Sequence, residues 1–296
     1  MRLRVLVSAL LLAAGCSPKK LALNAVAGAL SGSSGSYASD PDPQLVRDAV
    51  PFALKTQESV LAQLPRHRRL LIATGAGFAQ YAWGWLAHDA EVLEARDFQA
   101  GLALRRRARA LLLRGRDYAL RALDVDHPGL AAELRTGKAE RLEETGLREV
   151  EALYWAGAAW GAAISILKDD PDLISDVPVV EALLRRSLAL DESYDHGAAH
   201  EAVMALEAGL AGGSLARARE HFERAVELAR GQKASPLVGY AESVLVHNQD
   251  RPGFEKMLAQ ALAIDVDREP ALRLSNLLAQ ERARWLLGRL DDLFVE

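Results

Sequence analysis

The sequence predicts an all-α fold, and two observations carry that prediction. From Pro43 onward alanine and leucine dominate, β-branched residues are scarce, and no alternation with a period of two persists. Proline, glycine and paired acidic residues also interrupt the apolar pattern at short intervals, as they do between consecutive helices. These breaks fall at Leu64-Pro65, His127-Pro128-Gly129, Asp169-Asp170-Pro171, Gly212-Gly213, Gln249–Gly253 and Glu269-Pro270.

A five-residue pattern recurs where helices are expected to end: small, aliphatic, any residue, aliphatic and usually Asp. Its copies begin at Ala122, Ser187, Ala225 and Ala261, at intervals of 65, 38 and 36 residues. The last two intervals are close to the ~34-residue period of tetratricopeptide repeats, and the first is close to two periods. Such repeats share one continuous core, so residues 44–296 are predicted to form a single helical-repeat solenoid of divergent tetratricopeptide-like pairs. The alternative is a common helix ending in an alanine-rich protein.

The chain begins with a pattern typical of bacterial lipoproteins. A short positive region is followed by an apolar run over residues 5–14, far below the ~20 residues that cross a bilayer. Ala14-Gly15 offers small residues to a peptidase, and Cys16 is the only cysteine. We therefore expect residues 1–15 to be a cleaved signal peptide and a lipid on Cys16 to anchor the protein to a membrane. The alternative is a lone buried cysteine.

Residues 16–43 are expected to comprise the lipidated cysteine and a flexible tether. Four serines and two glycines lie within residues 31–36, and Asp40-Pro41-Asp42-Pro43 then resembles a helix start. A short helix over residues 19–30 is compatible with this prediction.

The expected export of the chain limits its functions. Ser17 follows the cysteine in place of the Asp that often retains lipoproteins at the inner membrane, so the inner leaflet of the outer membrane is the expected location. Removing residues 1–15 changes the net charge from −4 to −6, and this charge in the periplasm argues against nucleic-acid binding. With no second cysteine, the fold cannot depend on disulfides.

One local concentration of positive charge stands out against the acidic balance. It comprises Arg105, Arg106, Arg107, Arg109, Arg114, Arg116 and Arg121. We interpret it as a solvated helix face balanced by glutamates between residues 140 and 151. Docking of an acidic partner is the alternative.

No catalytic or metal-binding motif is evident. His200-Glu201 begins like a zincin helix, but Met204 occupies the position of the second histidine. His196 and His200 have helical i,i+4 spacing, although no third ligand is apparent. Asp169, Asp170 and Asp172 are predicted to cap a helix and close a turn. The sequence therefore predicts neither an enzyme nor a bound metal or cofactor.

Aromatic residues in two Ala/Gly-rich segments are the candidate lining of a ligand pocket or pore: Tyr81, Trp83, Trp85, Tyr154, Trp155 and Trp160. On an ideal helix Trp83 and Trp85 diverge by about 200°, so both cannot face one layer. Small residues between large rings permit close packing and also leave space. Core packing and an apolar pocket are therefore both open interpretations.

Several segments resemble one known family: Asp42–Thr56, Gly77–Ala82, Leu153–Ser165, Asp169–Pro171, Pro178–Arg186 and Asn276–Leu287. They resemble TatT, the lipoproteins associated with tripartite ATP-independent periplasmic (TRAP) transporters. The resemblance covers nearly the whole chain after Cys16. It implies an all-helical periplasmic lipoprotein that forms a homotrimer, has an aromatic-lined pore or cleft, and partners the periplasmic solute-binding receptor of the transporter. It supplies no catalytic residues.

Two functions are consistent with these observations. The first is a transport accessory that docks the receptor and holds a hydrophobic ligand. The second is a general scaffold lipoprotein for envelope assembly with no ligand.

Overall fold

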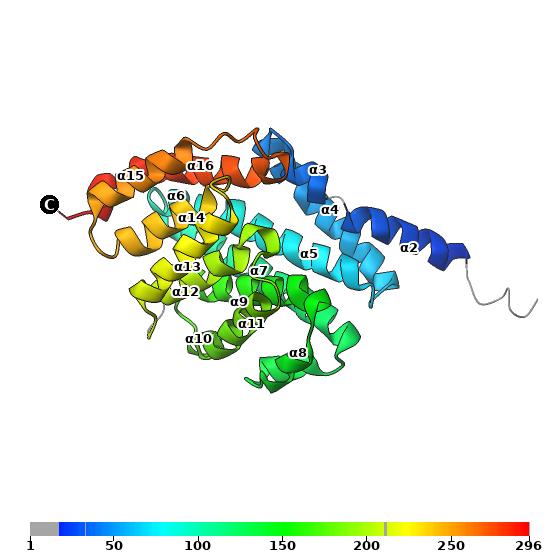
Figure 1. Cartoon of the computed structure of the whole chain (residues 1–296). Helices are drawn as coiled ribbons and strands as arrows, with labels where there is room; N and C mark the ends of the chain where they lie inside the picture. The colour runs from blue at the N-terminus through cyan, green and yellow to red at the C-terminus, as the bar shows by residue number, and fades with distance from the viewer. Residues whose placement is uncertain (1–17, 33, 210–211, 296) are drawn as a thin grey trace, which may run out of the picture.

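The computed structural model describes residues 18–32, 34–209 and 212–295. The predicted signal peptide and Cys16 lie outside these residues. The part of the chain described is built of helices joined by short loops, without a β-strand, so the all-α prediction is confirmed (Figure 1).

Helices follow one another from the first described residue. The N-terminal part comprises α2 (Pro18–Ser31), α3 (Ser34–Ala38), α4 (Pro43–Gln63), α5 (Arg68–Tyr81), the π-helix η1 (Ala82–Ala87), α6 (His88–Glu94), α7 (Phe98–Asp126) and α8 (Leu130–Arg135). The middle comprises η2 (Glu140–Glu144), η3 (Leu147–Glu149), α9 (Val150–Ile166), α10 (Pro171–Ser175), α11 (Val177–Leu190), η4 (Tyr194–His196), α12 (Ala198–Gly209) and α13 (Leu215–Leu228). The C-terminal part comprises α14 (Ser235–Tyr240), the π-helix η5 (Ala241–Leu245), α15 (Arg251–Leu262), η6 (Pro270–Leu272), α16 (Arg273–Leu287) and α17 (Leu290–Leu293).

All six sequence breaks fall at helix boundaries, either between two helices or reaching into the first turn of the next helix. The Asp42 carboxylate accepts hydrogen bonds from the first-turn amides of α4. Asp170 does the same for α10, 3.1 Å from the Leu173 amide, which confirms the predicted capping role. Asp169 instead pairs with Arg109 at 2.6 Å.

Small residues mark the places where helices approach most closely. The four residues that open the repeated pattern, Ala122, Ser187, Ala225 and Ala261, all have 0% exposure. A further close approach joins α5 to α7, where a Cβ on Gly75 would lie 2.8 Å from the Gly115 carbonyl and the reverse holds as well. Larger side chains at these positions would force the helices apart.

The region predicted as a tether contains two helices that contact the domain. Ala27 of α2 is fully buried, and Gln57 of α4 donates a hydrogen bond to the Leu30 carbonyl. After α3, the Ser39 carbonyl accepts a hydrogen bond of 2.6 Å from Arg273 of α16. The glycine and serine content predicted a flexible tether, whereas α2 packs against α4 and α5, and α3 contacts α16.

Helix α16 returns to the N-terminal part of the chain and lies beside α6 and α3 (Figure 1). Leu274 and Leu278 pack against the apolar cluster that includes Tyr81 and Trp85. Arg282 lies 3.1 Å from His88 and 2.7 Å from Glu91, and it also pairs with Glu242. The helical array is therefore closed by contacts between residues almost two hundred positions apart.

Two buried amides on α16 hold the preceding loops. Asn276 accepts a hydrogen bond from the Ala234 amide at 2.9 Å and donates one to the Gln232 carbonyl at 2.8 Å. Gln280 donates to carbonyls at the end of α15, the shortest distance being 2.8 Å to Ile264. The Asn276–Gln280 segment thus has a structural role in fixing the backbone of these loops.

Candidate functional site: an aromatic wall on helix α9

The six predicted aromatic residues divide into three environments. Tyr81 and Trp85 lie in one buried cluster, with ring centroids 5.9 Å apart. Tyr154 and Trp155 are partly exposed, with centroids 4.9 Å apart. Trp83 and Trp160 belong to neither pair.

Trp160 and Trp83 are the two extremes of exposure. Trp160 is 1% exposed, donates its indole N–H to Asp176 at 3.2 Å, and lies under the guanidinium of Arg116 at 4.5 Å. Trp83 is 54% exposed, whereas Trp85, two residues later in η1, is 7% exposed. The divergence expected of Trp83 and Trp85 is thus present, and Trp160 packs as a core residue.

A third ring extends the Tyr154–Trp155 pair. Tyr194, the first residue of η4, lies with its ring centroid 5.4 Å from that of Tyr154. Trp155 also packs against both apolar clusters of the N-terminal half, one of which contains Tyr81 and Trp85. We call Tyr154, Trp155 and Tyr194 the aromatic wall.

The side chains of the aromatic wall are partly buried and partly exposed. Desolvation raises the pKa of Tyr154 well above its ordinary value, and the charges of Asp195 and Glu201 raise it further. Desolvation likewise raises the pKa of Tyr194 and of the exposed Glu151, one helical turn before Trp155. The two tyrosines of the wall therefore combine accessible surface with partial desolvation by the surrounding protein. This combination makes the wall a candidate binding surface.

A buried lysine fixes the loop that carries Tyr194. The Lys233 ammonium lies 2.8 Å from Glu201 and 3.1 Å from the Asp195 carbonyl, and the side chain is 8% exposed. Desolvation would lower the pKa of Lys233, but the charges of Glu201 and Asp195 outweigh it and hold that pKa above its ordinary value. Asp195, His196 and Gly197 all have positive φ, an arrangement that persists only where surrounding contacts hold it.

Sequence reasoning missed Tyr194, Glu201 and Lys233 as neighbours of the wall. Tyr194 and Lys233 lie 40 and 79 residues after Tyr154, so no local spacing connects them. The one local signal is Gly197, because glycine often marks a backbone position with positive φ.

The i,i+4 spacing of His196 and His200 in the sequence does not place the two side chains on one helix. His196 lies in the left-handed loop before α12, so it does not share a helix with His200. The His200 ring instead meets His221 of α13, with 2.8 Å between the two Nδ1 atoms. No group of three or more metal-ligating side chains suited to a metal ion occurs among the described residues.

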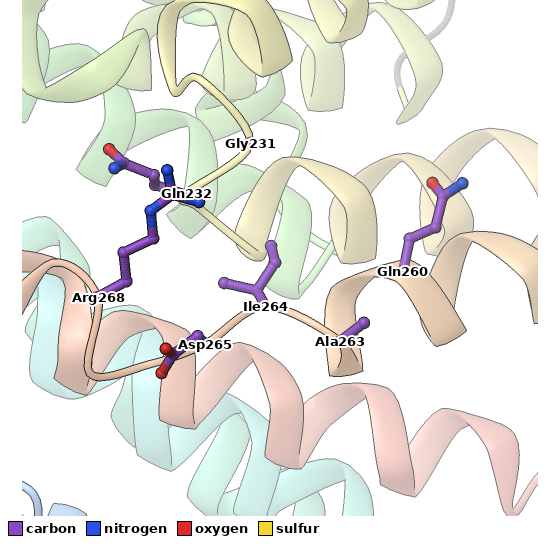
Figure 2. A pocket seen from close by; sticks show the side chains of 7 residues that line it. All are labelled: Gly231, Gln232, Gln260, Ala263, Ile264, Asp265 and Arg268. Atoms are coloured by element: carbon purple, nitrogen blue, oxygen red, sulfur yellow. The ribbon is translucent and has the colours of Figure 1, made fainter.

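A separate open hollow of about 300 Å³ lies between the end of α15 and the loop before α14 (Figure 2). Its lining comprises Gly231, Gln232, Gln260, Ala263, Ile264, Asp265 and Arg268. Arg268 extends across it towards Gln232, as Figure 2 shows. None of the six predicted aromatic residues lines this hollow, so it is distinct from the aromatic wall.

The arginine concentration is mostly neutralised within the protein, although by other residues than the glutamates expected. Arg105 pairs with Glu94 at 2.5 Å, Arg109 pairs with Asp169, and Arg114 pairs with Glu58. Arg116 pairs with the adjacent Asp117 at 2.9 Å. Helix packing brings Glu94, Asp169 and Glu58 to α7 from other segments, which the sequence order did not indicate.

The fold and the wall define an all-helical protein with a partly exposed aromatic surface, an arrangement suited to binding. None of the described helices is long and apolar enough to span a bilayer. The family model of the TRAP transporter T-component, TatT, matches residues 39–294, and the chain belongs to this family of transporter accessory components, which is not a family of enzymes. The chain is 31% identical over 307 residues to an uncharacterized protein of Treponema pallidum (strain Nichols), with coverage of 97% of this chain and 95% of that protein.

Proposed function

We propose that this protein is the lipid-anchored periplasmic accessory component of a TRAP transporter. In this proposal a solenoid of tetratricopeptide-like pairs docks the solute-binding receptor and presents the aromatic wall to a hydrophobic ligand. Family membership supports the transporter association. The observation that carries the ligand proposal is the contiguous contact of three partly exposed rings, those of Tyr154, Trp155 and Tyr194.

The wall is suited to an apolar solute for a physical reason. Aromatic rings give a large contact area with few rotatable bonds, so a ligand gains apolar burial at a small cost in side-chain order. Lys233 and Glu201 neutralise one another behind the wall and hold the Tyr194 loop in place. The wall therefore presents aromatic rings and hydroxyls, and the nearby Glu201 carboxylate is paired with Lys233.

The anchor and the assembly complete the proposal. Cys16 carries the lipid after removal of residues 1–15, and the protein resides at the periplasmic face of the outer membrane as a homotrimer. Loss of the thiol in Cys16→Ser should leave the protein unprocessed or released from the membrane fraction. Unchanged partitioning into a detergent phase would contradict the anchor.

Receptor docking is tested by isolating the protein from its own envelope after mild cross-linking. The expected partner is a periplasmic solute-binding receptor, identified by mass spectrometry. Trp155→Ala should weaken receptor or hydrophobic-probe binding by tenfold or more, whereas Leu147→Ala, which removes a side chain that is 71% exposed, should not. Recovery of envelope-assembly proteins without a receptor, and equal probe binding by both variants, would favour the general scaffold instead.

A further inference from the structure

Helix α2 has an outer face without a partner in the protein. Ala27 and Leu30 pack inwards, against the apolar cluster centred on α5, α7 and α9. The exposed side chains between Leu21 and Ala29 are small or apolar except for that of Asn24: Leu21, Ala22, Asn24, Ala25, Val26 and Ala29. Leu21 is 71% exposed and Val26 is 47% exposed, and small side chains flank both, so the apolar surface is continuous along this part of the helix.

The charge of α2 is as uneven as its hydrophobicity. Lys19 and Lys20 are exposed in its first turn, and no acidic residue occurs among its 14 residues. This differs from the rest of the chain, in which acidic residues outnumber basic ones. A positive end beside an apolar face is the pattern of helices that lie in a membrane interface, where lysines meet phosphate headgroups and aliphatic side chains enter the acyl boundary.

The position of α2 gives the direction of approach. The helix extends beyond α4 and α5 at one end of the molecule, and its N-terminal end is outermost (Figure 1). Pro18, its first residue, is two positions after Cys16 in the sequence. Two residues span at most about 7 Å when extended, so an acyl group on Cys16 would hold the first turn of α2 at the lipid headgroups.

We propose that the outer face of α2 lies on the bilayer surface as a second, non-covalent membrane contact. This inference rests on the proposed acylation of Cys16. A single acyl anchor allows the domain to swivel, whereas a helix seated in the interface fixes its orientation. The domain then stands on the membrane by the α2 end, with α15 at the far end of the molecule (Figure 1).

The test uses the full acylated protein reconstituted in vesicles of phosphatidylethanolamine and phosphatidylglycerol. Acylation consumes Cys16, so Ala25→Cys supplies the only free thiol for an environment-sensitive fluorophore. Ala259→Cys on the exposed side of α15 is the matched control. The dye at residue 25 should shift to the blue and be quenched at least threefold by lipids with a spin label near the headgroup, and the dye at residue 259 should show neither change.

Variants of the face separate its contribution from that of the anchor. The double change Leu21→Glu and Val26→Glu should abolish the quenching at residue 25 while the protein still floats with the vesicles. Leu147→Glu, an equally exposed site outside α2, should leave it unchanged.

The outcomes distinguish the two proposals. Protein that floats with vesicles but keeps residue 25 in water overturns the membrane contact and leaves the anchor intact. Self-quenching at residue 25 in detergent, without lipid, shows that a second copy covers the face and also overturns it. Protein that does not float at all overturns both.

Discussion

Two tryptophans on one helix provide a sharp test of the distinction between core and wall. Trp155 and Trp160 both belong to α9, and truncation to alanine removes the same atoms from each. Trp160 is 1% exposed, and its loss leaves a large cavity beneath Arg116 and removes the indole donor to Asp176. We expect Trp160→Ala to lower the free energy of unfolding by about 3–5 kcal/mol.

Trp155 should be less costly to remove because part of its ring already contacts solvent. We expect about 1–3 kcal/mol for Trp155→Ala, since less apolar area leaves the core. Trp83→Ala, which removes a ring that is 54% exposed, should stay within about 0.5 kcal/mol. Urea unfolding followed by far-UV circular dichroism measures the free energy of unfolding of all three variants, which are compared at a common m-value. Equal costs for Trp155→Ala and Trp160→Ala, with no change in probe binding by the former, would refute the assignment of Trp155 to a binding surface.

Three further predictions concern packing, buried hydrogen bonds and pH. Asn276→Ala should lower the free energy of unfolding by about 2–4 kcal/mol because it leaves a buried amide and a carbonyl unpaired. Asn276→Asp should not restore the lost stability, because a carboxylate cannot donate a hydrogen bond to that carbonyl. A urea midpoint of either variant equal to that of the unmodified chain would contradict the structural role of Asn276. Gly115→Ala should lower the free energy of unfolding by about 1–3 kcal/mol or more, because the added methyl group clashes with α5. Gly28→Ala adds a methyl group that meets nothing within 4 Å and should stabilise α2 by about 0.5–1 kcal/mol. Thermal shifts of the same sign for both variants would count against the close crossing of α5 and α7. Desolvation lowers the pKa of both His200 and His221, so the unfolded chain binds more protons than the folded chain below the ordinary pKa of 6.5. The contribution of these histidines to the free energy of unfolding should therefore be complete above that pH and decline as the pH falls below it. His221→Gln should flatten the decline in urea midpoints between pH 7 and 5, and an unchanged slope would contradict this prediction.

The helix boundaries could be predicted from sequence because they depend on local chemistry. Asp170 followed by proline, for example, caps a helix through its own carboxylate and the adjacent backbone. The separation of Trp155 from Trp160 was also accessible in principle, since five residues place two side chains about 140° apart on a helix. The membership of Tyr194 in the wall was not accessible, because three consecutive residues of positive φ turn the chain there, and contacts with Lys233 stabilise that turn.

Distant parts of the chain jointly determine the geometry of the aromatic wall. Lys233 holds the Tyr194 loop, and the backbone next to Lys233 is held in turn by Asn276 of α16. Arg282 of the same helix contacts His88 and Glu91. His88 directly follows η1, the π-helix that carries Trp83 and Trp85. A shift of α16 would therefore change the contacts that position both the wall and the segment carrying the exposed Trp83. A receptor docked on the exposed Trp83 would reach the wall through this connected set of hydrogen bonds. Receptor-induced changes in the fluorescence of Trp155 should then disappear in Arg282→Met while receptor affinity is retained; persistence of those changes would mean that the two surfaces communicate by another route.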